Sequence, residues 1–204
     1  MADALTAGPR ELRRSPLGHL SAEMEAASAP GIRLREVAFT TQIGVRAEPG
    51  SAAHRAIAEA TGVDLPVGAG DVAGDASRTA VLWLAPDEFL VITDPDRHDL
   101  LVGLRDALDD APGQVVDLSA NRTILEVAGP CARDALDKGV PADLHPRAFA
   151  VNTAITTTLS TVPVLAWRTA DDTYRVLPRA SFAEYVAAWL MDAAREYHAQ
   201  EAAS

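Results

Sequence analysis

The pattern of apolar and polar residues predicts strands alternating with helices from residue 31 onward. The segments "IRLREVAF" and "TAVLWLAPDEFLVITD" group or alternate apolar residues as strands do, and a turn at residues 85–88 favours a hairpin in the second. "TQIGVRAE" continues as a second strand or as the same strand after a bend, and Ser51 and Gly62 bound a predicted helix. A second helix follows Asp94-Pro95 with leucines at helical spacing, and "QVVDLS" predicts the strand after it. Residues 31–118 therefore follow the β-α-β-β-α-β order of ferredoxin-like folds.

A second half with its own strands and helices follows at residues 119–200. "RTILEVA" predicts a strand, and Gly129-Pro130 opens a helix that Gly139 ends. Further strands are expected at about residues 151–159, 162–168 and 173–178. The closing helix carries a capping box, formed by Ser181 and Glu184. It also carries one broad apolar stripe, made of Phe182, Tyr185, Val186, Trp189, Leu190, Ala193 and Tyr197. The predicted fold class is α+β, with two ferredoxin-like halves packed as one unit.

Residues 1–30 differ from the rest of the chain. They contain three prolines and a cluster of arginines, and their apolar residues have no clear period. We predict an extended N-terminal arm. Leu17 and Leu20 in "SPLGHL" support an arm that docks onto another surface as much as a frayed tail.

Composition narrows the class of protein. The chain carries 29 acidic against 18 basic residues, a net charge of −11, which disfavours nucleic acid and anionic membranes as partners. A single cysteine excludes an internal disulfide framework. No apolar run has the length of a membrane span, and the N-terminus lacks the apolar region of a signal peptide. We expect a soluble, cytoplasmic protein.

The residues that usually carry chemistry do not form a recognisable site. Gly68–Gly74 is glycine-rich, but its spacing is not that of a dinucleotide fingerprint. The five histidines are scattered, and no Gly-x-Ser-x-Gly elbow is present. Cys131 lies at a predicted helix start but is interpreted as a small core residue. We predict no catalytic, cofactor-binding or metal-binding residue in this chain.

One segment, "RDALDKGVPADLHPRAF", concentrates unusual residues. His145 precedes Pro146, which favours an extended conformation with Asp143, His145 and Arg147 along one side. Leu144 and Phe149 are candidates to anchor the other side. Three readings stay open: a loop held by hydrogen bonds, a rigid interface with another protein, or a general base with an acidic orienter. The residues favour them in that order.

The segments "SPLGHL", "LWLAPDEFLVI", "VDLSANRTILEVAGPCARDALDKGVPADLHPRAF" and "RASFAEYVAAWLMDAAREY" together resemble one known family. They are similar, in the same order, to the gamma subunits of heterotetrameric sarcosine oxidase. Asp117-x-Ser119 followed by Gly129-Pro130-x-Ala132 also resembles part of the folate-binding aminomethyltransferase fold.

The resemblance implies a subunit of an enzyme complex. Such complexes demethylate sarcosine to glycine with oxygen, giving hydrogen peroxide and formaldehyde or, with tetrahydrofolate, methylenetetrahydrofolate. It implies FAD, FMN and NAD in the large alpha and beta subunits, zinc in the delta subunit, and no cofactor in the gamma subunit. The gamma subunit is expected to pack chiefly against the folate-binding part of alpha.

The chain departs from the family pattern at Val140, where a cysteine is usual, and in "AVNTAITTT" after Phe149. Both changes bear on how the subunit meets its partner. Our first hypothesis is a non-catalytic subunit whose partner interface is shaped by Arg122, His145, Arg147 and Phe149. The alternative is a stand-alone folate-binding module or aminomethyltransferase-like enzyme, which saturable folate binding by the isolated chain would distinguish.

Overall fold

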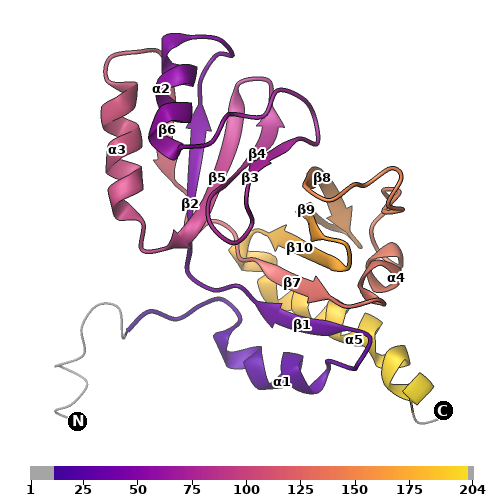
Figure 1. Ribbon diagram of the computed structural model, residues 1–204. Helices are drawn as coiled ribbons and strands as arrows, with labels where there is room; N and C mark the ends of the chain where they lie inside the picture. The colour runs from indigo at the N-terminus through magenta and orange to yellow at the C-terminus, as the bar shows by residue number, and fades with distance from the viewer. Residues whose placement is uncertain (1–11, 202–204) are drawn as a thin grey trace, which may run out of the picture.

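The computed structural model describes residues 12–201 and contains two five-stranded antiparallel sheets with helices on their outer faces (Figure 1). The first sheet has the order β3-β4-β5-β2-β6 and the second β1-β7-β10-β9-β8. The strands are β1 (Arg33–Glu36), β2 (Thr40–Arg46), β3 (Val72–Gly74), β4 (Ala80–Ala85), β5 (Glu88–Pro95), β6 (Gln114–Asp117), β7 (Leu125–Ala128), β8 (Thr153–Leu159), β9 (Val162–Ala170) and β10 (Thr173–Pro178). The helices are η2 (Gly18–Leu20), α1 (Ser21–Ala26), α2 (Ala52–Thr61), α3 (His98–Leu108), α4 (Ala132–Asp137), η3 (Ala180–Phe182) and α5 (Ala183–Glu201).

The first half confirms the predicted ferredoxin-like arrangement. Its strands β6-β2-β5-β4 lie side by side, and β3 adds a short strand at the edge, inside the segment predicted as a glycine-rich loop. Helix α2 begins where Ser51 accepts a hydrogen bond from the His54 amide at 3.1 Å, and it ends at Gly62 with φ of 67°. A left-handed residue at that position favours glycine.

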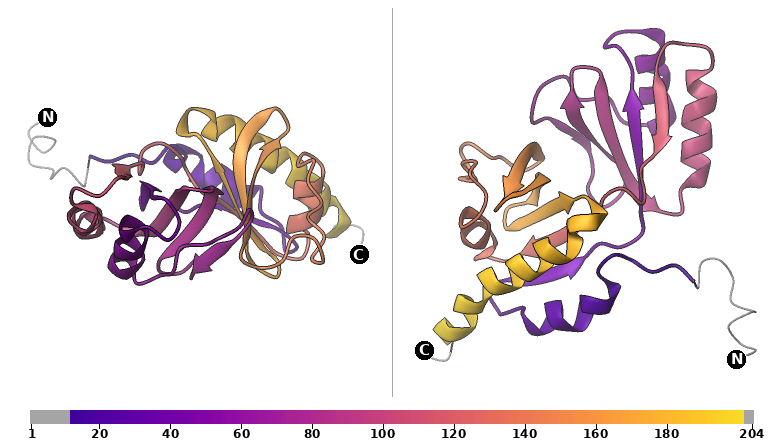
Figure 2. Two further views of the ribbon diagram at one scale, coloured as in Figure 1. Left: turned by 90° about the horizontal axis from the view of Figure 1, so that it is seen from above. Right: turned by 180° about the vertical axis from the view of Figure 1, so that it is seen from behind.

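The helices and sheets form a layered molecule. Helices α2 and α3 cover one face of the first sheet, whereas α4 and α5 lie against the second sheet (Figure 2). Successive side chains of a strand point to opposite faces of its sheet, so one strand contributes to the packing on both faces. On β5, Phe89 and Val91 pack toward α2 and α3, while Leu90 and Ile92 pack against residues of the second sheet such as Trp167. The two halves therefore share a buried layer.

Strand β1 corrects the predicted division of the chain. The sequence predicted residues 31–118 as one unit, but β1 pairs with β7 of the second sheet, with Leu34 opposite Val127. The second half ends in α5, so the described chain supplies no later strand for the edge beside β7. Strand β1, which precedes the first half in the sequence, occupies this edge. Leu34 of β1 and Ile32 just before it are buried in the core of the second half.

A buried ion network fixes the register of β1. Glu126 on β7 lies opposite Arg35 on β1 and Arg175 on β10. Its side chain is 7% exposed and contacts Arg35 at 2.6 Å and Arg175 at 3.5 Å. Arg175 also donates to the carbonyl of Ala76 at 2.9 Å, which joins the second sheet to the first half. A one-residue slip of β1 would turn Arg35 away from Glu126.

The N-terminal arm contains more structure than the sequence predicted. Residues 1–11 lie outside the described part of the chain, but η2 and α1 occupy residues 18–26 of the predicted arm. Leu17 and Met24 are buried in the core of the second half. The prediction of an arm without folded elements was wrong for these residues, because two short helices of three and six residues leave little periodicity to detect.

Helix α5 also differs in detail from its prediction. The predicted Ser181–Glu184 capping box is replaced by the short helix η3, and Glu184 lies 3.2 Å from His19. Val186 and Leu190 of the predicted stripe are buried, whereas Phe182 and Tyr185 are exposed. The stripe was drawn too wide, because a helix packed on one sheet buries only part of its circumference.

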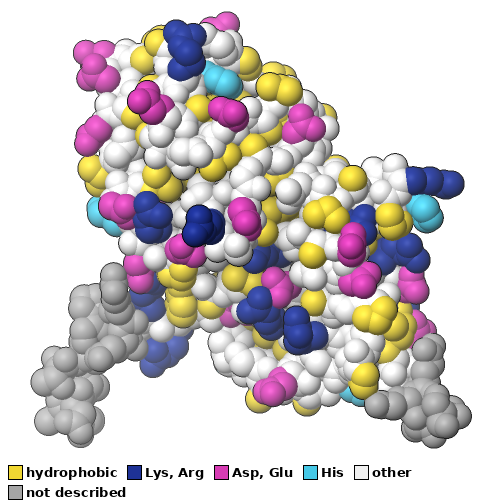
Figure 3. Space-filling model, in the orientation of Figure 1, with side chains coloured by type: hydrophobic (Ala, Val, Ile, Leu, Met, Phe, Trp, Pro, Cys, Tyr) yellow, Lys and Arg dark blue, Asp and Glu magenta, His cyan; other side chains and the backbone are white. Residues whose placement is uncertain are grey.

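The surface of the front face intersperses acidic and basic side chains (Figure 3). Among the described helices, none is both long and apolar enough to cross a bilayer.

Replacing Glu126 by Ala should lower the free energy of unfolding by about 3–5 kcal/mol, because Arg175 would stay buried without its carboxylate. Asp192→Ala is the matched control, since it removes an ion pair with Arg195 in which both side chains are largely exposed. That control should cost less than about 1 kcal/mol. Urea unfolding followed by tryptophan fluorescence measures both, and equal losses would contradict the assigned role of Glu126.

Candidate functional site

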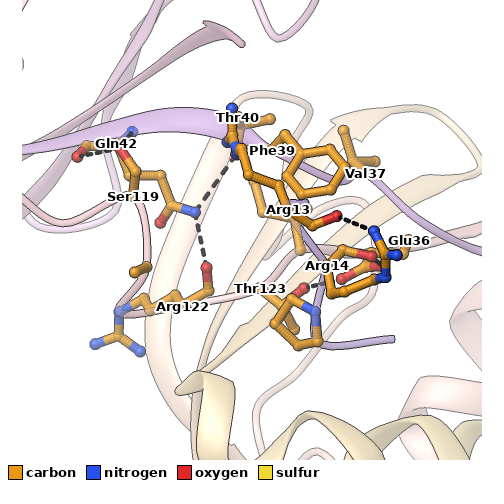
Figure 4. A pocket seen from close by; sticks show the side chains of 14 residues that line it. Arg13, Arg14, Glu36, Val37, Phe39, Thr40, Gln42, Ser119, Arg122 and Thr123 are labelled. Atoms are coloured by element: carbon orange, nitrogen blue, oxygen red, sulfur yellow. Dashed lines mark hydrogen bonds between the residues drawn. The ribbon is translucent and has the colours of Figure 1, made fainter. Parts of the chain in front are cut away.

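A cavity of about 420 Å³ lies where the two halves meet (Figure 4). Four segments line it: residues 13–16, the end of β1 with its connection to β2, the start of β2, and residues 119–124 after β6. Its walls thus come from both sheets and from the N-terminal segment. The chain crosses from the second sheet to the first between β1 and β2, and this crossing brings the four segments together.

Glu36 holds the N-terminal segment in place at this cavity. Its carboxylate accepts hydrogen bonds from the Ser15 hydroxyl at 2.6 Å, the Thr123 hydroxyl at 2.7 Å and the Leu17 amide at 3.3 Å. Three donors from within the chain therefore saturate much of this carboxylate. Such an arrangement is typical of an anchoring carboxylate, because a general base must reach a proton on a substrate.

Gln42 is the most buried polar side chain of the cavity wall, at 1% exposure. Its backbone amide donates to the Ser119 hydroxyl at 3.1 Å, and its side-chain amide donates to the carbonyl of Arg122 at 2.9 Å. Its Oε1 atom has no hydrogen-bond partner among the described residues. Gln42 therefore joins β2 to the loop that leads into the second half, and its Oε1 atom remains an acceptor without a donor among the described residues.

The Asp117-x-Ser119 motif shapes that same loop. The Asp117 carboxylate accepts from the Ser119 hydroxyl at 2.6 Å and from the Ser119 amide at 2.9 Å. These two hydrogen bonds, the hydroxyl bond first, lower the pKa of Asp117 below its ordinary value. The motif is a tight turn that places residues 119–124 against the cavity.

Arg13 closes one side of the cavity. It contacts Asp96 at 2.6 Å, and its guanidinium lies 4.6 Å from the centre of the Phe39 ring. Phe39 has φ of 61°, a left-handed conformation that is costly for an aromatic residue. The Arg13 guanidinium covers the Phe39 ring in this conformation, and strain of this kind is common at binding sites.

Arg122 is the one predicted site residue that lines the cavity. Its guanidinium donates to the carbonyl of Leu177 at 3.2 Å. Burial first, and the neighbouring charge of Arg179 second, lower the pKa of Arg122. Within residues 12–201, no group of three His, Cys, Asp or Glu side chains is placed to hold a metal ion. The chemistry present at the cavity is hydrogen bonding and charge.

The other predicted residues lie on the turn after α4. The His145 amide donates to the Asp143 carboxylate at 2.9 Å, and Nδ1 of His145 accepts from the Arg147 amide at 3.2 Å. Asp143 therefore holds the backbone and does not orient the imidazole ring as a catalytic partner would. His145 and Arg147 are exposed. This geometry fits a rigid turn presented to solvent.

Phe149 lies on the inner side of the turn, where the sequence made it a candidate anchor. It is 2% exposed and stacks on Tyr174, with ring centres 6.4 Å apart and planes 4° apart. Its carbonyl accepts from Arg168 at 2.8 Å. Phe149 therefore supports the turn from below, and its proposed part in a partner interface is to shape that turn. The structure does not bring Arg122 together with His145 and Arg147, because no contact joins them within the described chain.

Sequence reasoning missed Glu36 and Gln42 as cavity residues. One signal was present: Glu36 stands in phase with Ile32 and Leu34, on the side of the strand that is otherwise apolar. A carboxylate on the buried side of a strand indicates a hydrogen-bond or ion-pair partner inside the protein. For Gln42 no comparable signal exists, because its position depends on how β2 meets the loop of residues 119–124.

The comparisons with known proteins agree with this architecture. Residues 44–196 match the family model described as sarcosine oxidase, gamma subunit family. The chain belongs to the sarcosine oxidase gamma subunit family. It is 56% identical to the sarcosine oxidase subunit gamma of Corynebacterium sp. strain U-96 over the full length of both chains. It is 54% identical to that of Corynebacterium sp. strain P-1, covering 94% of this chain and 95% of the relative.

Two solved structures place the fold. A chain of the heterotetrameric sarcosine oxidase from Corynebacterium sp. U-96, in complex with pyrrole 2-carboxylate, matches with a TM-score of 0.89 and 58% identity, covering 91% of this chain and 96% of that one. The glycine cleavage system aminomethyltransferase T from Bartonella henselae matches with a TM-score of 0.61 and 18% identity, covering 86% of this chain and 49% of that one. The second likeness shows a shared fold.

Replacing Glu36 by Ala should release residues 13–17 from the cavity, because three hydrogen bonds to a charged acceptor are lost. Trypsin should then cleave after Arg13 and Arg14 about tenfold faster, as local opening becomes more frequent. Glu25→Ala is the control, since Glu25 is an exposed acid on α1. Mass spectrometry of the fragments measures the rates, and equal rates in both variants would contradict the anchoring role.

Proposed function

We propose that this chain is the gamma subunit of a heterotetrameric sarcosine oxidase and is itself non-catalytic. The complex would demethylate sarcosine to glycine, giving hydrogen peroxide and formaldehyde or, with tetrahydrofolate, methylenetetrahydrofolate. The observation that carries the proposal is the match over the whole chain, at 56% identity, to a subunit of this name. We place the complex in the cytoplasm.

The geometry of the cavity supports a structural role. Glu36 is hydrogen-bonded by three donors of the chain itself, and the ring of His145 has no carboxylate orienter among the contacts of its turn. We infer that FAD, FMN and NAD belong to the alpha and beta subunits, and zinc to delta. The alpha subunit, with its folate-binding part, is the proposed main partner.

A second candidate function rests on the unpartnered Oε1 of Gln42 in the cavity wall. A cavity of about 420 Å³ is large enough for a small ligand. A folate-binding module of aminomethyltransferase type is therefore the alternative. Titration of the isolated chain with tetrahydrofolate separates the two functions, and saturable binding with one site per chain would favour the alternative.

Co-expression with the alpha, beta and delta subunits tests the main proposal. With this chain present, we expect a four-subunit complex that releases peroxide when sarcosine is added. Without it, the remaining subunits should fail to form the complex, and the chain alone should release no peroxide. Subunit stoichiometry and a peroxide assay measure both. Peroxide from the isolated chain, or a complete and active complex without it, would overturn the proposal.

The turn that carries His145 and Arg147 is proposed as one part of the partner interface. The double substitution His145→Ala with Arg147→Ala should reduce incorporation into the complex several-fold, since exposed side chains on a rigid turn make good anchors. The flavin absorption of the large subunits should not change. Arg78→Ala, at another exposed position, is the control. A complex that stays intact but loses activity would instead show that the turn is catalytic.

A further inference from the structure

Two aromatic side chains stand exposed on the outer side of the second half. Phe182 is 43% exposed and Tyr185 is 45% exposed, in a chain with only four Phe, three Trp and three Tyr. Phe39 is also exposed, at 40%, but it lies at the cavity beside Arg13, whereas Trp167 and Tyr174 are buried in the cores. An exposed aromatic pair in a chain this poor in aromatic residues indicates a surface with a purpose beyond packing.

These aromatic residues continue a line that begins with an arginine. Arg179 is the residue before η3, and its carbonyl accepts from the Phe182 amide at 2.9 Å. In a 3₁₀ turn, side chains three residues apart lie on the same side. Tyr185 follows three residues later on α5, and its hydroxyl lies 3.1 Å from the hydroxyl of Ser160. Seen from behind, α5 lies in front of the second sheet (Figure 2).

The charges beside this line are cations without acidic partners. Arg179 is exposed and forms no ion pair with a described residue. The backbones of Arg122 and Arg179 lie side by side in an isolated antiparallel β-bridge. Within residues 12–201, the Arg122 guanidinium donates a hydrogen bond to a backbone carbonyl and to no carboxylate. Burial and the charge of Arg179 lower the pKa of Arg122. The acid nearest in sequence, Glu184, instead contacts His19. Two neighbouring arginines without a carboxylate partner, in a chain of net charge −11, favour binding of an anionic group from outside the chain.

We propose that Arg122, Arg179, Phe182 and Tyr185 form a docking surface, the arginine-aromatic patch, for another subunit of the oxidase. The occupant is a segment that carries a carboxylate next to apolar side chains. Arginine and aromatic residues are the types most enriched at the energetic centres of protein interfaces. This inference rests on the proposed function, because the partner is a subunit of that complex.

A second copy of this chain fits the patch less well. In a two-fold symmetric dimer the same patch would face itself, so the two arginines of one copy would approach those of the other. Like charges brought together across an interface oppose binding. A partner segment with a carboxylate satisfies the cations and covers the aromatic rings at the same time.

Competition for incorporation tests the patch in the assembled complex. Wild-type and variant chains with different tags are co-expressed with the alpha, beta and delta subunits, and the ratio of tags in the purified complex is measured. Phe182→Ala and Arg179→Glu should each fall to roughly one tenth of the wild-type share. Val102→Ala and Arg55→Glu are the controls: Val102 is 42% exposed on α3 and Arg55 is exposed on α2, both in the first half. The controls should compete equally with wild type.

The possible outcomes separate the two levels of the proposal. If wild-type chain never enters the complex, the proposed function fails. If wild-type chain enters and both patch variants compete equally with it, the patch inference fails while the proposed function stands. Loss of a homodimer of the isolated chain in Phe182→Ala, with incorporation unchanged, would assign the patch to a second copy and overturn the inference. A melting temperature of each variant equal to that of the controls establishes that folding does not account for a loss.

Discussion

The contact of Glu126 with Arg35 and Arg175 is the interaction on which the rest of this structure depends. It lies across three neighbouring strands, and its central carboxylate is buried. A carboxylate removed from water is stable only when cations and hydrogen-bond donors compensate for its lost hydration. The network therefore forms only when β1 and β10 flank β7 in one register. It acts as a lock on the position of β1.

Several features of the molecule follow from the position of β1. The strand precedes the first half in the chain but belongs to the sheet of the second half. The chain must then cross between the halves at residues 37–39, and this crossing places Glu36 and Gln42 on two sides of one cavity. Glu36 in turn holds residues 15–17. The two halves are thus interlocked, in addition to sharing the layer that contains Leu90 and Trp167.

Interlocked halves suit a subunit that contributes shape to a complex. The polar groups of the cavity mostly bond to one another, whereas Arg179, Phe182 and Tyr185 of the arginine-aromatic patch are exposed. Buried polar groups whose hydrogen bonds are made within the protein keep a site rigid. Exposed arginine and aromatic side chains are common anchors of protein interfaces. The fold shared with an aminomethyltransferase at 18% identity shows that the same scaffold serves different proteins.

Local signals in the sequence determined the elements of the first half. Ser51 and Gly62 bounded α2 correctly, and the leucines of α3 are buried as their spacing predicted. The fold class and the family followed from the order of these elements and from the resemblance of whole segments. These signals are local, because capping, turns and helical periodicity depend on residues only a few positions apart.

Only the tertiary structure decided where these elements meet. The pairing of β1 with β7 joins residues about 90 positions apart, and no local pattern specifies such a pair. For the same reason the sequence placed Phe182 on the apolar stripe of the closing helix, although the structure leaves it exposed. Burial depends on what packs against a side chain, and that is a property of the whole fold.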